Sequence, residues 1–298
     1  MRHEPPTTEA RNPRTVDIDT WDTQEAIALL QDEDARAVRA AADASGQVTE
    51  AVEAAHARLG RGGRVHYFGA GASGRLAVLD ATEITPTFGT DPDLFTAHFP
   101  GGAPALADSS LDFEDADALG EKDARLLGEN DVAVGITASG STAYVAGALR
   151  GARRVGALRV LVTCNPTAFL LDRCDLPVVA DTGPEALTGS TRLKAGTATK
   201  VVLNSFSTAL MIRAGRTYSN LMVGLVATNT KLRERSVELL VQASGQPRER
   251  CKVALDQAKG RVEPALVSLL SEVPIERASA VWNEHGSVRA AVTALESR

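Results

Sequence analysis

Residues 69–75 read GAGASGR, follow a short apolar segment at 64–68 and precede helix-forming sequence. A second stretch with nearly the same residues, TASGST at 137–142, follows the apolar segment 131–136 in the same way. Each pattern predicts a buried strand, a turn of small residues and a helix. In such a unit the backbone can approach an anion closely, and the free N–H groups and positive end of the helix attract it. We therefore expect two phosphate-binding turns, in which Ser73, Gly74, Ser139, Ser141 and Thr142 are candidate ligand-binding residues.

Strand and helix patterns alternate from residue 60 to about residue 218. Strands are expected near 64, 94 and 131 and at 158–164 and 176–181, with helices from 74 and 142. This alternation predicts the α/β class with a doubly wound parallel sheet. The expected domains are an N-terminal arm with helices at 1–59, a phosphosugar-binding domain at 60–218, a connecting helix at 219–246 and a small domain of three helices at 247–298, with breaks at Gly260, Pro274 and Gly286.

Composition excludes several classes of function. The net charge of −6 provides no basic surface for nucleic acid. No stretch approaches the roughly 20 apolar residues that span a bilayer, and no leader pattern precedes the first helix, so we expect a cytoplasmic protein without a membrane partner. The three cysteines lack metal-site spacing and are interpreted as reduced thiols. We expect neither a metal nor another cofactor.

The glycines Gly69, Gly71 and Gly74 match the dinucleotide-binding fingerprint GxGxxG. That fingerprint expects an acidic residue about 20 positions further on, at the end of the next strand. Here the next strand-like run, 94–99, ends in Pro-Gly-Gly at 100–102, and a dinucleotide would leave the second turn unexplained. A plain structural turn is the other alternative. We favour a phosphosugar site over both.

A third segment, GPEALTGSTRLKAG at 183–196, follows the last expected strand and leads into a long helix. Ser190 or Thr191 could cap that helix, because serine and threonine hydroxyls accept hydrogen bonds from free N–H groups at helix starts. A cap and a ligand contact are compatible. We therefore include Glu185, Ser190 and Thr191 among the candidate substrate-binding residues.

Several further motifs carry a resemblance to a known family. They are TEARNP at 8–13, DED at 32–34, LDATE at 79–83, PTFG at 86–89, YSNLMV at 218–223 and ATN at 227–229. With the first turn and the third segment, they closely resemble the N-acetylmuramic acid 6-phosphate etherases over almost the whole chain. The resemblance implies a sugar isomerase-type αβα domain, a homodimer with sites near its interface, and a lyase that recycles cell-wall amino sugars.

The family's two catalytic acids correspond to Glu83 and Glu114 in this sequence. Without the resemblance, Glu83 would be an exposed carboxylate near a helix end and Glu114 part of an acidic loop. The motif around Glu114 is one residue shorter than usual, so Asp112, Asp115 and Glu185 are the next candidates for the base. The second turn also departs from the family, with Ser141 where arginine is usual.

The resemblance implies a lyase that removes the D-lactyl ether from C3 of N-acetylmuramic acid 6-phosphate and yields N-acetylglucosamine 6-phosphate and D-lactate. In the open-chain sugar the C2 hydrogen is next to an aldehyde, so elimination followed by water addition is chemically accessible. Glu83 would be the acid and Glu114 the base, and burial with mutual repulsion should raise the pKa of one of them. An aldose–ketose isomerase and a non-catalytic sugar-phosphate regulator are the alternatives.

Overall fold

The computed structural model describes residues 7–224 and 230–297. The chain divides into two compact units. The first comprises residues up to Thr82 together with Asp93–Ser207, and the second comprises Glu83–Pro92 and Thr208–Arg298. The family motif at 227–229 and five residues of the expected connecting helix, 225–229, lie outside the described residues.

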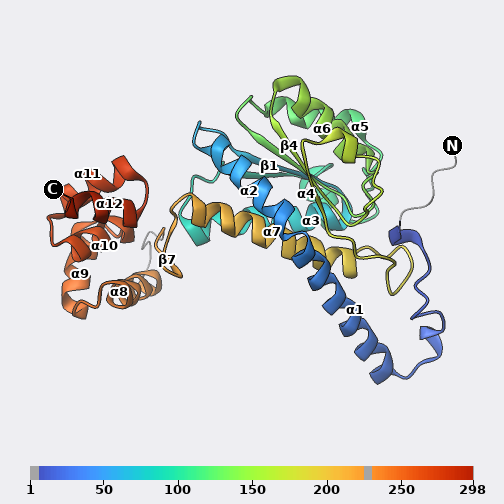
Figure 1. The fold of residues 1–298 in the computed structure, drawn as a ribbon, viewed down its shortest axis with the longest axis horizontal. Coiled ribbons are helices and arrows are strands. Elements are labelled where there is room, and N and C mark those ends of the chain that lie inside the picture. The colour runs from blue at the N-terminus through green and yellow to red at the C-terminus, as the bar shows by residue number, and fades with distance from the viewer. Residues whose placement is uncertain (1–6, 225–229, 298) are drawn as a thin grey trace. The chain divides into compact units, whose positions relative to one another are not determined.

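The first unit is built on a five-stranded sheet in the order β2-β1-β3-β4-β5 (Figure 1). All four neighbouring pairs of strands are parallel. The central strands β1 and β3 are buried at every position, as expected when helices cover both faces of a parallel sheet. The strands are β1 (Val65–Gly69), β2 (Phe95–His98), β3 (Val132–Ile136), β4 (Leu158–Thr163) and β5 (Leu176–Val179).

Helices cover both faces of this sheet. In Figure 1, α5 (Asp117–Asp123) and α6 (Ala143–Val155) lie on one side, and α2 (Ser45–Leu59), α3 (Gly71–Phe88) and α7 (Lys194–Arg213) lie on the other. Helix α6 packs on β1, β3 and β4, whereas α2 packs on β4 and β5. The predicted α/β class and doubly wound parallel sheet are therefore confirmed.

The strand order determines where a ligand can bind. From β1 the chain crosses to β2 on one side, and from β3 it crosses to β4 on the other. Parallel sheets bind ligands at the carboxyl ends of the two strands where this direction reverses. Here those strands are β1 and β3, and the two turns singled out in the sequence follow them directly.

The N-terminal part of the first unit is helical. It contains the 3-10 turns η1 (Thr7–Glu9) and η2 (Ile18–Thr20) and the long helix α1 (Thr23–Asp43), which Asp22 caps by accepting a hydrogen bond from the N–H of Glu25. The connections between strands contain α4 (Gly102–Ala107), η3 (Ala124–Leu126) and η4 (Leu171–Arg173).

The second unit is mainly helical. A short antiparallel pair, β6 (Thr217–Tyr218) and β7 (Leu221–Met222), precedes α8 (Thr230–Ser244). Four helices follow, one more than the sequence predicts, because the three expected breaks separate four helical segments. They are α9 (Arg248–Gln257), α10 (Val262–Ser271), α11 (Ile275–His285) and α12 (Val288–Glu296), which share a hydrophobic core. Within 7–224 and 230–297, no helix is both long and apolar enough to cross a membrane.

Candidate active site

Internal hydrogen bonds brace the turn after β3. The hydroxyl of Thr137 lies 2.8 Å from that of Thr142, and the N–H of Gly140 donates to Thr137 Oγ1 at 3.2 Å. Asn165, which follows β4, donates to the carbonyl of Ser139 at 2.9 Å. The Oγ atoms of Ser139 and Ser141 lie 3.0 Å apart, with Ser141 exposed. The turn therefore presents these hydroxyls on a fixed backbone.

The turn after β1 requires glycine. Gly71 begins α3 with φ of +53°, a left-handed conformation that a side chain disfavours. A methyl group at this position would also lie 2.7 Å from Oε1 of Glu114. The carboxylate of Glu114 therefore packs directly against the backbone of the first turn, two residues before Ser73.

The backbone of Glu114 is tied to the second turn. Its carbonyl accepts a hydrogen bond at 2.9 Å from the N–H of Tyr144, which lies in the first turn of α6, just after Thr142. Its own N–H donates to Asp112 Oδ1 at 2.9 Å. The main chain of Glu114 is thus fixed next to one turn while its side chain reaches the other. The structure brings this predicted catalytic residue to the switch point of the sheet.

A cavity of about 240 Å³ opens in front of this carboxylate. Burial raises the pKa of Glu114, and the negative charges of Asp112 and Asp115 raise it further. A carboxylate with a raised pKa is a stronger base, which suits proton abstraction near neutral pH. The cavity is lined by residues of the first turn, by Arg75 and by the segment from Phe99 to Glu114.

Arg75 holds this segment in place, a role that the sequence does not reveal. Its guanidinium donates to the carbonyls of Leu106, at 3.0 Å, and Ala105, at 3.3 Å. It also lies over the ring of Phe99, 5.5 Å from its centroid. An arginine in a sequence is usually expected to pair with a carboxylate or a phosphate. Arg75 instead contacts backbone carbonyls and an aromatic ring.

Glu185 is buried and caps α7. Its carboxylate oxygens accept hydrogen bonds at 2.9 Å from the N–H groups of Lys194 and Ala195. Burial raises its pKa, while these two N–H groups act in the opposite direction. Ser190 and Thr191, which the sequence suggested as caps, are instead half-buried in the loop before the helix. The N–H groups of the first two residues of α7 donate to Glu185, so Glu185 caps the helix in place of these hydroxyls.

Glu83 belongs to the second unit, where its side chain is exposed on α3. In the first unit, the same helix is anchored by Asp80, whose role the sequence did not indicate. The hydroxyl of Tyr67 on β1 donates to Asp80 Oδ2 at 2.9 Å, and that of Ser207 on α7 donates to Asp80 Oδ1 at 3.1 Å. Burial raises the pKa of Asp80. This anchor lies one helical turn before Glu83.

Asp112→Asn is expected to move the acid limb of the pH–rate profile to lower pH. A base must be deprotonated, so the rate falls as the pH drops through the pKa of Glu114. Removing the charge of Asp112 lowers that pKa, while the asparagine oxygen can still accept from the N–H of Glu114. Activity measured from pH 4 to 9 tests this, with Asp108→Asn as a matched carboxylate that should leave the limb in place. An unmoved limb in Asp112→Asn would argue against Glu114 as the titrating base.

Comparison with known proteins shows sequence similarity over most of the chain. The family model of the glucokinase regulatory protein N-terminal SIS domain matches residues 47–153. A protein from Thermobifida fusca that bears the name N-acetylmuramic acid 6-phosphate etherase is 50% identical over 264 residues, which cover 89% of this chain and 87% of the relative. A protein of the same name from Deinococcus radiodurans is 47% identical and covers 89% of this chain and 88% of its own.

Among solved structures, a phosphoheptose isomerase from Francisella tularensis matches with a TM-score of 0.52. The match covers 64% of this chain and 98% of that protein at 17% identity. This similarity shows the fold alone.

Proposed function

The chain belongs to the N-acetylmuramic acid 6-phosphate etherase family, and from that premise we propose how its carboxylates divide the reaction. The enzyme cleaves the lactyl ether of N-acetylmuramic acid 6-phosphate. In our proposal Glu114 removes the C2 proton of the open-chain sugar. The observation that carries this assignment is the position of Glu114, with its carboxylate against Gly71 in the first turn and its carbonyl bonded to Tyr144 beside the second.

Removal of the C2 proton makes departure of the ether oxygen possible. The electron pair of the C2–H bond forms the C2–C3 double bond, and the C3–O bond breaks. Because an alkoxide is a poor leaving group, an acid must protonate that oxygen, and we assign this role to Glu83. Each such proton transfer contributes about 10²–10⁴-fold to the rate. Water then adds at C3, which yields N-acetylglucosamine 6-phosphate and D-lactate. These steps are proton transfers and a hydration, so the proposal invokes no metal or redox cofactor.

The two turns supply the grip on the phosphosugar in this proposal. Free N–H groups and the positive end of a helix attract phosphate, and hydroxyls add hydrogen bonds. The residues of the turns assigned to binding are Ser73, Gly74, Ser139, Ser141 and Thr142. Ser190 and Thr191, in the third segment at 183–196, are assigned to binding as well. The location of both turns at the switch point of the sheet supports this assignment. Glu185 contributes indirectly, by capping α7.

Ser73→Ala and Ser139→Ala are expected to raise KM more than they lower kcat. Each hydroxyl would bind the ligand equally in the ground and transition states, and a hydrogen bond to a charged group is worth about 1.5–3 kcal/mol. Initial rates over a range of substrate concentrations measure the split. Ser205→Ala is the control, because the hydroxyl of Ser205 bonds within its own helix. Unchanged KM in both turn variants would refute the proposed grip.

The direct test of the activity is incubation of the pure protein with N-acetylmuramic acid 6-phosphate and an assay for D-lactate. In ¹⁸O-labelled water, the proposed route places the label on C3 of the sugar and none on the lactate ether oxygen. Label on lactate would instead indicate displacement at the lactyl carbon. Binding without D-lactate release would indicate a regulator, and a rearranged sugar that retains its lactyl group would indicate an isomerase.

We also propose that the protein is a homodimer in the cytoplasm, as the family resemblance implies. Helix α1 supports the dimer because it is long, yet only Glu33, Ala37, Ala40 and Ala41 in it are buried. Ile27 and Val38 are 49% and 48% exposed and lie about three turns apart on one face, where they are available for a second copy.

Light scattering on micromolar protein should give twice the chain's mass of 31.3 kDa. Changing both Ile27 and Val38 to Glu should shift the mass to that of one chain, because a charge cannot be buried unpaired in an apolar contact. Wild-type protein that is monomeric and fully active would refute the dimer.

A further inference from the structure

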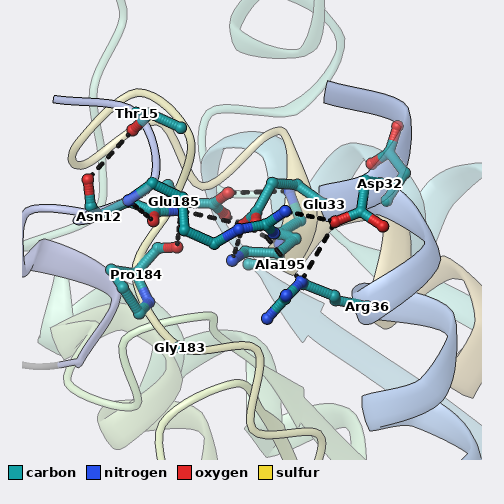
Figure 2. A network of polar contacts seen from close by, with 12 residues as sticks. Asn12, Thr15, Asp32, Glu33, Arg36, Gly183, Pro184, Glu185 and Ala195 are labelled. Atoms are coloured by element: carbon teal, nitrogen blue, oxygen red, sulfur yellow. Dashed lines mark hydrogen bonds and ion pairs between the residues drawn. The ribbon is translucent and has the colours of Figure 1, made fainter. Parts of the chain in front are cut away.

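A buried ion pair that the proposed reaction does not use lies at the start of α7 (Figure 2). Glu33 of α1 and Lys194, the first residue of α7, form it, and each is only 3% exposed. The carboxylate of Glu33 also pairs with Arg14 and accepts a hydrogen bond at 3.0 Å from Asn12 Nδ2. Arg36 approaches it at 3.6 Å. Four donors from three segments thus converge on one carboxylate.

The charges around Glu33 keep it ionised. Burial acts to raise its pKa, but Lys194, Arg14 and Asn12 outweigh burial and hold the pKa below its ordinary value. Removing one partner of a buried pair is costly because the other charge stays buried without compensation. The cluster around Glu33 is therefore costly to disrupt.

The same cluster holds the segment 183–193, which carries Ser190 and Thr191. Asn12 donates to the carbonyl of Pro184 at 3.3 Å, so it joins the N-terminal arm to the start of the segment. Lys194 marks the end of the segment, and its N–H is bound by Glu185. The arm also meets the middle of the segment, because a methyl group on Gly189 would lie 3.1 Å from Glu9 Oε2.

Apolar packing does not hold this segment along its whole length. Leu187 is 49% exposed, and the two residues after it are exposed as well. A cavity of about 420 Å³ lies between the arm, α1 and the segment, lined by Asn12, Arg14, Glu33, Lys194 and their neighbours. Polar contacts therefore help to hold the two ends of the segment.

We propose that Glu33 is a positioning residue for substrate binding. Through Asn12 and Lys194, it holds both ends of segment 183–193 so that Ser190 and Thr191 face the ligand. The N-terminal arm contacts Glu33 through Asn12 and Arg14 and thereby helps to hold the segment. This inference rests on the ligand role proposed for Ser190 and Thr191.

Substitutions at Asn12 and Glu33 test whether this contact positions the segment. Asn12→Asp places a second carboxylate beside Glu33, and Glu33→Gln removes the counter-charge of Lys194. Each should raise KM for N-acetylmuramic acid 6-phosphate about tenfold, with kcat within about threefold of wild type. The carboxylate that Asn12→Asp introduces cannot donate to the carbonyl of Pro184, so the double variant should not restore KM. Because both changes act on the same segment, KM should rise no further than in the single variants. Asp34→Asn is the matched control, because Asp34 also joins α1 to α7, through Thr197 at 3.0 Å, but does not contact the segment.

A second cycle separates positioning from general stability. Glu33→Gln is combined with the pair Ser190→Ala and Thr191→Ala. Residues that act through one another show non-additive effects, whereas independent ones add. If Glu33 acts through the segment, its effect on KM should largely disappear once both hydroxyls are gone. Additive effects on KM would overturn the proposal and leave the ligand role of the hydroxyls intact. Unchanged KM in the hydroxyl variant itself would overturn both.

Discussion

Gly71→Ala is expected to lower kcat by about 10²-fold or more. The added methyl group would lie 2.7 Å from Oε1 of Glu114, so the carboxylate must move away from the first turn. A misplacement of about 1 Å at a reacting group costs about two orders of magnitude in rate. Alanine at φ of +53° adds roughly 1–2 kcal/mol of backbone strain. Steady-state kinetics and a thermal melt measure the two effects separately.

Gly62→Ala provides the matched control. Gly62 has φ of +82°, yet no atom lies within 4 Å of the position of an added methyl group. It should show the same kind of loss in melting temperature without the loss of activity. If Gly71→Ala retains wild-type kcat, the contact between Glu114 and the first turn has no catalytic significance.

Glu83→Gln is expected to lower kcat about 10²–10⁴-fold, because no acid remains to protonate the departing oxygen. The side chain is exposed on α3, so the isosteric change should not disturb packing. A substrate analogue with a halide at C3 needs no proton on its leaving group. The variant should therefore eliminate halide at nearly the wild-type rate.

Thr82→Ala is the control on the same helix, since the hydroxyl of Thr82 bonds to the carbonyl of Val78 within α3. Its activity should stay within about twofold of wild type, as is usual for an exposed substitution. An equal loss on both substrates in Glu83→Gln would argue against Glu83 as the acid.

Local sequence patterns were sufficient to predict the sheet and its two turns. Buried parallel strands are apolar runs, and a turn that approaches an anion needs small residues, so residues 64–75 and 131–142 carry both signals. The sequence predicts the helical nature of the C-terminal region, but it predicts three helices where the structure has four. Their breaks were identified correctly at Gly260, Pro274 and Gly286, and these breaks separate four helices.

Long-range contacts could not be predicted in this way. The contact between Glu114 and Gly71 depends on how the acidic loop returns to β1, which no periodicity encodes. Glu33 and Lys194 are 161 positions apart, and charged residues in a sequence ordinarily indicate exposed positions. The residue that caps α7 could not be identified from the sequence for a similar reason. Glu185 lies nine positions before Lys194 and outside the usual capping position, whereas Ser190 and Thr191 lie closer to the start of the helix and carry the hydroxyls typical of caps.

Hydrogen exchange at C2 of the sugar is the most direct test of Glu114 as the base. When the reaction runs in heavy water, the wild-type enzyme should place deuterium at C2 of N-acetylglucosamine 6-phosphate. Glu83→Gln should retain exchange at C2, because its base is intact, whereas Glu114→Gln should lose both exchange and turnover. Exchange at the wild-type rate in Glu114→Gln would contradict the assignment and direct attention to Asp112 and Asp115.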